Sequence, residues 1–232
     1  MRIAMWSGPR NLSTAMMYAF GNRPDFAVWD EPFYAAYLKA TGLNHPMREE
    51  IIAADENDAA QVAARCIGPI PGDLPHFYLK VMPHHMVADF PVAWAKDCVN
   101  IHLIRHPARV IASYAAKRET VTAEDLGFAQ QVAMFDRLGG LVIDSADIRD
   151  DPQEMLHLMC DAIGLSFDPA MLSWPLGGHA SDGVWAPHWY GAVHASTGFA
   201  GPEGPLPALS GAEADLLDQT MPHYERLARE KI

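Results

Sequence analysis

Short runs of apolar residues recur along the chain and alternate with longer stretches typical of helices. Most of these runs are continuously apolar, which is expected of strands that are covered by helices on both faces. Five runs predict strands: Ile3–Trp6, Phe26–Trp29, Phe77–Val81, Asn100–Ile104 and Leu141–Asp144. The pattern indicates an α/β fold with three layers, α/β/α, around a mostly parallel central sheet of about five strands.

Seven helices are predicted between and after these strands. Pro107 and Pro152 stand where a helix begins, a position that suits the fixed φ and missing N–H of proline. Ser210 precedes the last helix and is expected to cap it. The predicted helices are Leu12–Phe20, Tyr34–Ala40, Asp58–Arg65, Pro107–Lys117, Ala123–Leu138, Pro152–Ile163 and Glu213–Arg229.

The segment 174–207 breaks this regular alternation. It is rich in Gly and Pro, has no clear period and contains three Trp. A loop of this length in a compact domain is usually functional or disordered, and the tryptophans favour an ordered one. We therefore expect a single domain over 1–232, with 174–207 as an ordered flap over a cleft and 210–230 as a C-terminal helix.

Composition narrows the function classes. Half of the 232 residues are apolar and 20% are charged, as in ordinary globular proteins. The 17 Lys and Arg against 29 Asp and Glu give a net charge of −12, which argues against nucleic acid or an anionic membrane as a partner. An anionic ligand therefore requires the few cations to gather in one place.

The cysteines and the apolar runs indicate the compartment. Cys66, Cys98 and Cys160 are scattered without a CxxC spacing, so we expect neither a disulfide framework nor a zinc ribbon. No apolar run is long enough for a signal peptide or a membrane span. These features predict a cytoplasmic protein.

The first strand runs into a loop that is a candidate anion site. A strand–loop–helix turn aims backbone N–H groups and the positive helix end at one spot, Gly8 permits close approach, and Arg10 adds a cation. The nucleotide-binding P-loop reads GxxxxGK[ST], whereas here Leu-Ser replaces Gly-Lys, which weakens a case for ATP or GTP chemistry. The alternative is a helix simply capped by Ser7 or Asn11. The loop comprises Ser7, Gly8, Pro9, Arg10, Asn11, Leu12, Ser13 and Thr14.

Acids and a lysine follow the second and third strands. Asp30 and Glu31 either hold Mg²⁺, or Glu31 serves as a general base, or the pair caps the next helix. Lys80 emerges at the strand end where open α/β sheets bind ligands, unless it forms a structural ion pair. His84 and His85 are adjacent and diverge on a helix, so we expect no metal there.

The fourth strand ends in a second set of anion-binding groups. Arg105 leaves the strand, and Arg109 and Ser113 share a helix face because they are four residues apart. A guanidinium fork from Arg105 and the Ser113 hydroxyl together suit one tetrahedral anion. Cations from two strand ends thus stand where a nucleotide-hydrolysing enzyme would use a metal.

These segments resemble the sulfotransferases that use 3′-phosphoadenosine 5′-phosphosulfate (PAPS), over about residues 1–172. SGPRNLST is similar to their 5′-phosphosulfate loop, with Arg10 in place of the usual lysine, and RHPARVIAS is similar to their 3′-phosphate motif. DSADIRDDPQEMLHLMCDAIGL, which starts at Asp144, is similar to the segment after their last core strand. WDEPFY resembles an EP motif whose glutamate is taken as the base. The opening WSGPRNLST is also similar to a branch in which some members are fused to aminotransferase-like domains.

The resemblance implies a P-loop-like fold and sulfuryl transfer from PAPS, as cosubstrate, to a hydroxyl or amine of a small-molecule acceptor, with no metal. Glu31 would be the base, and Arg10 and Lys80 would stabilise the leaving charge. The loop from Ser7 to Thr14 would hold the 5′-phosphate, and Arg105 and Ser113 would hold the 3′-phosphate.

The flap residues Trp185, His188, Trp189 and Tyr190 would stack on adenine or wall the acceptor pocket, if they do not merely pack on the core.

The sequence also departs from the family. The cytosolic enzymes place a basic histidine two residues after the lysine, where this chain has Met82, so His84 and His85 are the reserve candidates for the base. Their basic glycine-rich C-terminal loop is replaced by the weakly cationic SDGVWAPHWY. Two alternatives therefore stand beside a sulfotransferase: a P-loop kinase or NTPase with Mg²⁺ on Asp30 and Glu31, and a catalytically silent nucleotide-binding module.

Overall fold

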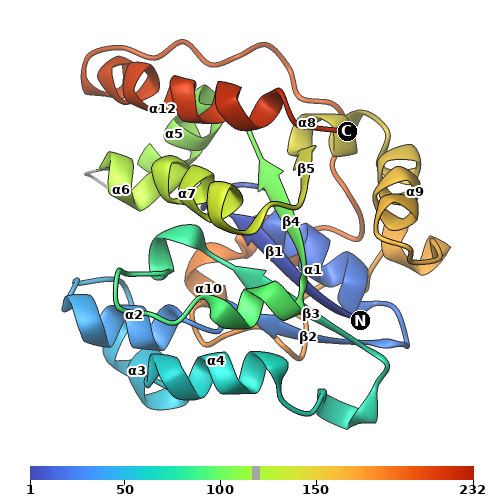
Figure 1. The fold of residues 1–232 in the computed structure, drawn as a ribbon. Helices are drawn as coiled ribbons and strands as arrows, with labels where there is room; N and C mark the ends of the chain where they lie inside the picture. Colours follow the sequence, from blue (N-terminus) through green and yellow to red (C-terminus); the bar gives the residue numbers. More distant parts are fainter. Residues whose placement is uncertain (117–120) are drawn as a thin grey trace.

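A computed structural model describes residues 1–116 and 121–232 of the chain. Five strands form a parallel sheet in the order β2-β3-β1-β4-β5 (Figure 1). They are β1 (Arg2–Ser7), β2 (Phe26–Asp30), β3 (His76–Val81), β4 (Val99–Ile104) and β5 (Leu141–Asp144). Each predicted strand is confirmed to within one residue at either end.

Helices cover both faces of this sheet, which confirms the predicted three layers. The α-helices are α1 (Ser13–Gly21), α2 (Tyr34–Thr41), α3 (Arg48–Ala54), α4 (Ala59–Ile67), α5 (Pro107–Ala115), α6 (Ala123–Leu126), α7 (Phe128–Leu138), α8 (Ser145–Asp150), α9 (Pro152–Ala162), α10 (Ala186–Trp189), α11 (Gly191–His194) and α12 (Ala212–Ala228). Short 3₁₀ turns are η1 (Pro71–Asp73), η2 (Pro83–His85), η3 (Ala93–Asp97) and η4 (Pro169–Leu172). Of the helices described, none is long and apolar enough to cross a bilayer.

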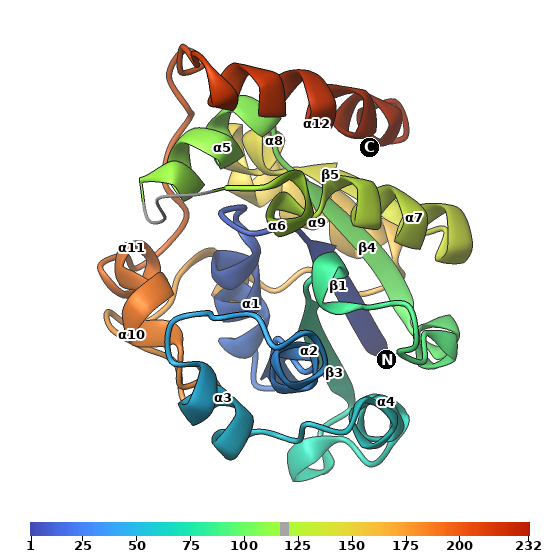
Figure 2. The ribbon, with the colours of Figure 1, turned by 90° about the vertical axis from the view of Figure 1, so that its left-hand side faces the viewer.

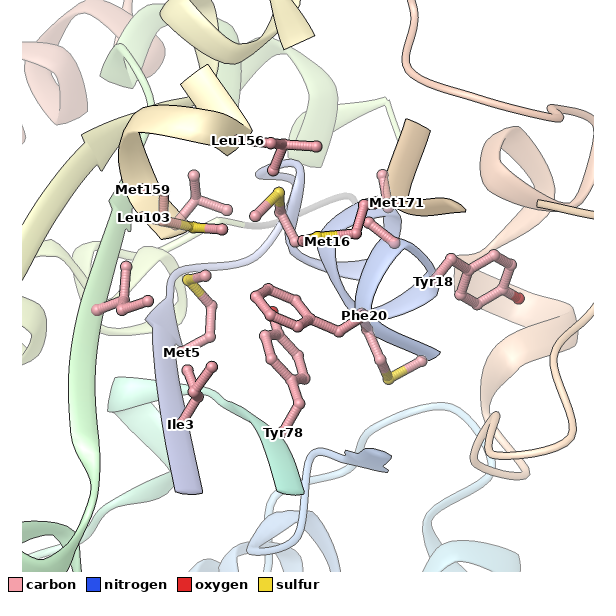
Figure 3. Close-up of a cluster of buried hydrophobic side chains, with 14 of the residues drawn as sticks. Ile3, Met5, Met16, Tyr18, Phe20, Tyr78, Leu103, Leu156, Met159 and Met171 are labelled. Atoms are coloured by element: carbon pink, nitrogen blue, oxygen red, sulfur yellow. The ribbon is translucent and has the colours of Figure 1, made fainter. Parts of the chain in front are cut away.

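Alternate residues of β1 divide the core between the two faces. Ile3 and Met5 join a cluster with side chains of α1, β3, β4 and α9 (Figure 3). Ala4 and Trp6 join a second cluster with α4, η3 and α7 on the opposite face. All four side chains are fully buried, so a strand with apolar residues at every position is explained by burial on both sides.

The last helix closes the second face near the β4–β5 edge. α12 lies along α5 and α7, as both views show (Figures 1 and 2). Its Leu227 packs against Ile104 and Val142. The Tyr224 hydroxyl donates to Asp144 Oδ2 at 2.7 Å, and Asp144 also caps α8 through the N–H of Ala146. The end of the sheet is therefore fastened to the C-terminal helix.

Several predicted helix boundaries are wrong. The predicted helix Ala123–Leu138 is two helices, because Gly127 takes a left-handed conformation with φ of 73° that ends α6. Ser210 does not cap α12, since Gly211 is the N-cap and no side chain bonds there. The predicted end of α5 at Lys117 lies outside the described residues. The short helices α3, α8, α10 and α11 have no counterpart in the prediction, because one or two turns carry too little periodicity.

The segment 174–207 folds against the helices at the β2 side of the sheet. Trp185 and Tyr190 are buried in a cluster with Tyr34 and Leu38 of α2 and Ile51 of α3. The chain then continues through α11 and a stretch without helix or strand to α12. Figure 2 shows this stretch rising from α11 toward α12.

We predict that the buried ring of His102 makes the fold sensitive to acid. His102 is fully buried, its Nε2 lies 3.1 Å from the Gly139 carbonyl oxygen, and burial lowers its pKa to about 4. Between about pH 6.5 and 4, His102 is protonated in the unfolded chain but neutral in the folded chain. The free energy of unfolding therefore decreases as the pH is lowered through this range.

Urea titrations at pH 7, 6 and 5 give the free energy of unfolding at each pH. As the pH is lowered, this free energy should decrease less for His102→Gln than for the unmutated protein. The slopes should differ by up to about 1.4 kcal/mol per pH unit, the value for one proton. The exposed His157→Gln is the matched control and should leave the slope unchanged. Equal slopes for all three proteins would contradict the prediction.

Candidate functional site

A cavity of about 580 Å³ lies where the strands end at their carboxyl edge. Strand register brings the predicted residues to this edge, because Asp30 pairs with Lys80 and Arg105 directly follows β4. Its walls come from the β1–α1 loop, the ends of β2, β3 and β4, helices α5 and α8, and the segment 174–207. Open α/β sheets bind their ligands at this edge.

The β1–α1 loop is braced by two amide side chains. Asn11 Nδ2 donates to the Leu103 carbonyl at 2.8 Å. Gln131 of α7, itself buried, donates from Nε2 to the carbonyls of Trp6 at 3.0 Å and Leu103 at 2.9 Å. These bonds fix the loop to the end of β4. Gln131 could not be identified from the sequence, since a single polar residue in a helix gives no sign of its partners.

The two ends of the loop differ in their exposure to the cavity. Pro9–Thr14 line the cavity, while Ser7 is fully buried beneath it. A Cβ on Gly8 would lie 2.7 Å from the Leu126 carbonyl oxygen, so the missing side chain of this glycine permits the close approach of α6. The reading that Ser7 or Asn11 caps α1 is wrong, because Leu12 is the N-cap and no side chain caps it.

Arg10, Arg105 and Ser113 meet at this loop. Arg105 Nη1 donates to the Arg10 carbonyl at 2.5 Å, and Arg10 Nε donates to Ser113 Oγ at 3.0 Å. All three side chains line the cavity. Arg10 has a left-handed backbone with φ of 52°, a strained conformation that is common at functional sites. Burial and the nearby Arg105 charge lower the Arg10 pKa.

Two further arginines stand beside Arg105, and a glutamate lies among the three. Glu203 Oε1 accepts from Arg105 and, at 2.6 Å, from Arg149 of α8. Its Oε2 lies 2.8 Å from Arg109 Nε. From the sequence, Arg109 was evident only as a neighbour of Ser113, and Arg149 and Glu203 were not identified.

Lys80 is the centre of a buried polar cluster on the other side of the loop. Its Nζ donates to Asp30 Oδ1 at 2.9 Å, Glu31 Oε1 at 2.7 Å and the Tyr190 hydroxyl at 2.6 Å. Asp30 and Lys80 are almost wholly buried, whereas Glu31 and Lys80 both line the cavity. Glu31 has a left-handed backbone with φ of 42°. Asp30 thus binds the lysine on the side away from the cavity, and Glu31 is the carboxylate that faces the cavity.

The charges in this cluster depend on one another. Burial works against the Lys80 ammonium, but the Asp30 and Glu31 carboxylates outweigh it and raise its pKa. Burial raises the pKa of Asp30 to about 6, although the Lys80 charge opposes the shift. Asp30 and Lys80 therefore both carry their charges at neutral pH. Both acids point at an ammonium instead of an open metal position, and among the described residues no three His, Cys, Asp or Glu gather as metal ligands.

The aromatic residues Trp185, Trp189 and Tyr190 of the segment 174–207 make different contacts. Tyr190 donates to both oxygens of Asp30, at 2.9 and 2.8 Å, and accepts from the Trp185 indole N–H at 2.9 Å. Trp185 packs edge-on against Tyr34 and is buried. Trp189 and Tyr190 line the cavity, whereas Trp185 does not. Trp189 stacks on Tyr114, and its carbonyl accepts from Arg10 at 3.3 Å.

One end of the cavity has aromatic walls. The His85 ring stacks on Tyr34 and Tyr37 with centroids 4.5 and 4.7 Å away. Burial lowers the pKa of His84 to about 4 and that of His85 well below its usual value, so both rings are neutral at pH 7. The Nδ1 atoms of both lack a hydrogen-bond partner among the described residues. The two reserve candidates for a base thus line the cavity beside Tyr34.

Comparisons with known proteins identify the family and the fold. The family described as sulfotransferase domain matches residues 1–230. Two solved structures share the fold: the sulfotransferase domain from the curacin biosynthetic pathway and that from the Synechococcus PCC 7002 olefin synthase. Their TM-scores are 0.53 and 0.52 at 17% identity, over 95% and 96% of this chain and 96% and 94% of theirs.

Two longer plant proteins are similar in sequence. Branched-chain-amino-acid aminotransferase-like proteins 2 and 1 of Arabidopsis thaliana are 33% and 34% identical over 230 residues, which is 97% of this chain. The chain spans 41% of the length of each relative. Since the family match extends over nearly every residue, the chain belongs to the sulfotransferase domain family.

Proposed function

We propose that this domain transfers a sulfuryl group from PAPS to a hydroxyl or amine of a small-molecule acceptor. The supporting observation is that one cavity brings together the loop cation Arg10, the Arg105 and Ser113 pair, and the Lys80–Glu31 pair. A donor with two separate anionic groups needs two cationic positions, and an acceptor hydroxyl needs a base beside them. The residues supply both within one space.

The donor fits the cations that line this cavity. Pro9–Thr14, with Arg10, would hold the 5′-phosphosulfate, while Arg105 and Ser113 would hold the ribose 3′-phosphate. The Arg105 guanidinium already binds a carboxylate, that of Glu203, so the position accepts an oxyanion. Trp189, which faces the cavity, is better placed than Trp185 to stack on an aromatic ring.

The transfer is a direct displacement at sulfur. The acceptor oxygen forms a bond to sulfur as the bond from sulfur to the bridging phosphate oxygen breaks, and that oxygen keeps the electron pair. The acceptor proton passes to Glu31, so the products are a sulfated acceptor and 3′,5′-diphosphoadenosine. Arg10 and Lys80 stabilise the negative charge that develops on the leaving oxygen. His84 and His85, which are neutral, are the alternative proton acceptors.

We predict that 3′,5′-diphosphoadenosine binds without Mg²⁺ and that Arg105 carries much of the affinity. Calorimetry should give the same Kd with and without Mg²⁺, and Arg105→Ala should weaken binding by about tenfold to a hundredfold, as expected for a lost charged hydrogen bond. The control is Arg226→Ala, which removes exposed ion pairs of a residue that does not line the cavity. No binding to the unmutated protein, or none lost in Arg105→Ala, would overturn the proposal. Mg²⁺-dependent ATP turnover that Asp30→Asn abolishes would favour a kinase or NTPase instead.

We predict a separation of binding from turnover at Glu31. Glu31→Gln keeps the shape of the side chain but removes the base, so turnover should fall about a hundredfold or more while the Kd for 3′,5′-diphosphoadenosine changes little. Release of this nucleotide from PAPS is measured over a panel of phenols, alcohols and amines. The exposed Glu50→Gln should behave like the unmutated protein.

Full turnover in Glu31→Gln would assign the proton to His84 or His85, which His84→Gln and His85→Gln then test. Binding without product from any acceptor would indicate a catalytically silent nucleotide-binding module.

A further inference from the structure

Glu203 is a buried acid in an otherwise exposed stretch of chain. Its side chain is 5% exposed, while its neighbours Pro202, Gly204 and Pro205 are exposed. The stretch from Gly201 to Leu206 has neither helix nor strand. The Glu203 carboxylate is therefore buried, although the segment 201–206 that carries it is mostly exposed and has no regular secondary structure.

Three guanidinium groups from three elements converge on this carboxylate. Arg105 follows β4, Arg109 belongs to α5 and Arg149 to α8, and each has a nitrogen within ion-pair distance of Glu203. Arg149 Nε also donates to the Gly201 carbonyl at 2.8 Å, and Arg109 Nη2 donates to that of Gly204. The arginines thus bind the segment by its acid and by its backbone.

The cluster has more positive charge than Glu203 can neutralise. Three guanidinium groups face one carboxylate, in a chain whose net charge is −12. Burial works against the carboxylate, but Arg105, Arg109 and Arg149 outweigh it and lower the Glu203 pKa. Guanidinium forks bind phosphate with the same geometry as carboxylate, and a dianion would match three arginines better than a monoanion does.

The cluster also opens onto the cavity. Arg105 and Arg149 line it, together with Ser145 at the start of α8. The Ser145 hydroxyl is buried and has no hydrogen-bond partner among the described residues. A ligand that enters beside Arg105 therefore meets Arg149 and Ser145 as well.

We infer that Arg105, Arg109 and Arg149 form one three-arginine phosphate site, and that Glu203 occupies it as an internal substitute which the ribose 3′-phosphate of the nucleotide displaces. The inference rests on the proposed function, since the phosphate is that of the donor. It adds Arg109, Arg149 and Glu203 to the residues that determine which nucleotide binds. Displacement exchanges one carboxylate for a phosphate and releases the segment 201–206 from the arginines.

The test compares two nucleotides that differ only in the 3′-phosphate. Calorimetry with 3′,5′-diphosphoadenosine and with adenosine 5′-phosphate is run on the unmutated protein, Glu203→Gln and Glu203→Ala. Both variants should bind the diphosphate about tenfold more tightly, because no carboxylate has to leave, and should bind the monophosphate within twofold of the unmutated protein. Arg149→Ala should weaken only the diphosphate, by about tenfold.

A matched control and the affinities for both nucleotides separate displacement from a structural role. Glu230→Gln removes a glutamate from an exposed pair with Arg226 and should change neither affinity. If Glu203 instead holds the site together, Glu203→Gln and Glu203→Ala bind both nucleotides more weakly or unchanged, and the inference is overturned while the proposed function stands. Equal losses for both nucleotides in Arg149→Ala overturn it too. If neither the unmutated protein nor the Glu203 variants bind the diphosphate, the proposed function itself fails.

Discussion

The buried ammonium of Lys80 is the interaction on which the site depends. A charge so deeply buried is costly unless it is paired and hydrogen-bonded, and Lys80 has Asp30, Glu31 and Tyr190 as partners. These partners come from the end of β2 and from the segment 174–207. One side chain therefore joins the sheet edge to the segment 174–207, and this segment is held by polar bonds at Tyr190 as well as by its apolar contacts.

Elements that are determined by local pattern could be predicted from the sequence. Parallel strands buried on both faces have to be apolar at nearly every position, so β1 to β5 were evident, and Pro107 and Pro152 begin α5 and α9 as expected. The shared position of the loop after β1 and the residues at the ends of β3 and β4 could also be predicted, because the topology of a parallel sheet brings its strand ends together.

Contacts between distant segments could not be predicted. Nothing local distinguishes Glu203 from other acids of this acidic chain, and its arginine partners lie 54 to 98 residues away. Tyr190 and Gln131 are similar cases, because each forms a hydrogen bond to a partner more than 100 residues away in sequence, Lys80 for Tyr190 and Trp6 for Gln131. The contact of Gly8 with α6 is hidden for the same reason, since the carbonyl that this glycine accommodates belongs to Leu126.

The neighbours Trp189 and Tyr190 link two cations of the cavity. Trp189 binds Arg10 through its carbonyl, and Tyr190 binds Lys80 through its hydroxyl. Because the two residues are adjacent in the chain, a substitution that displaces one of them would disturb a hydrogen bond of each cation together.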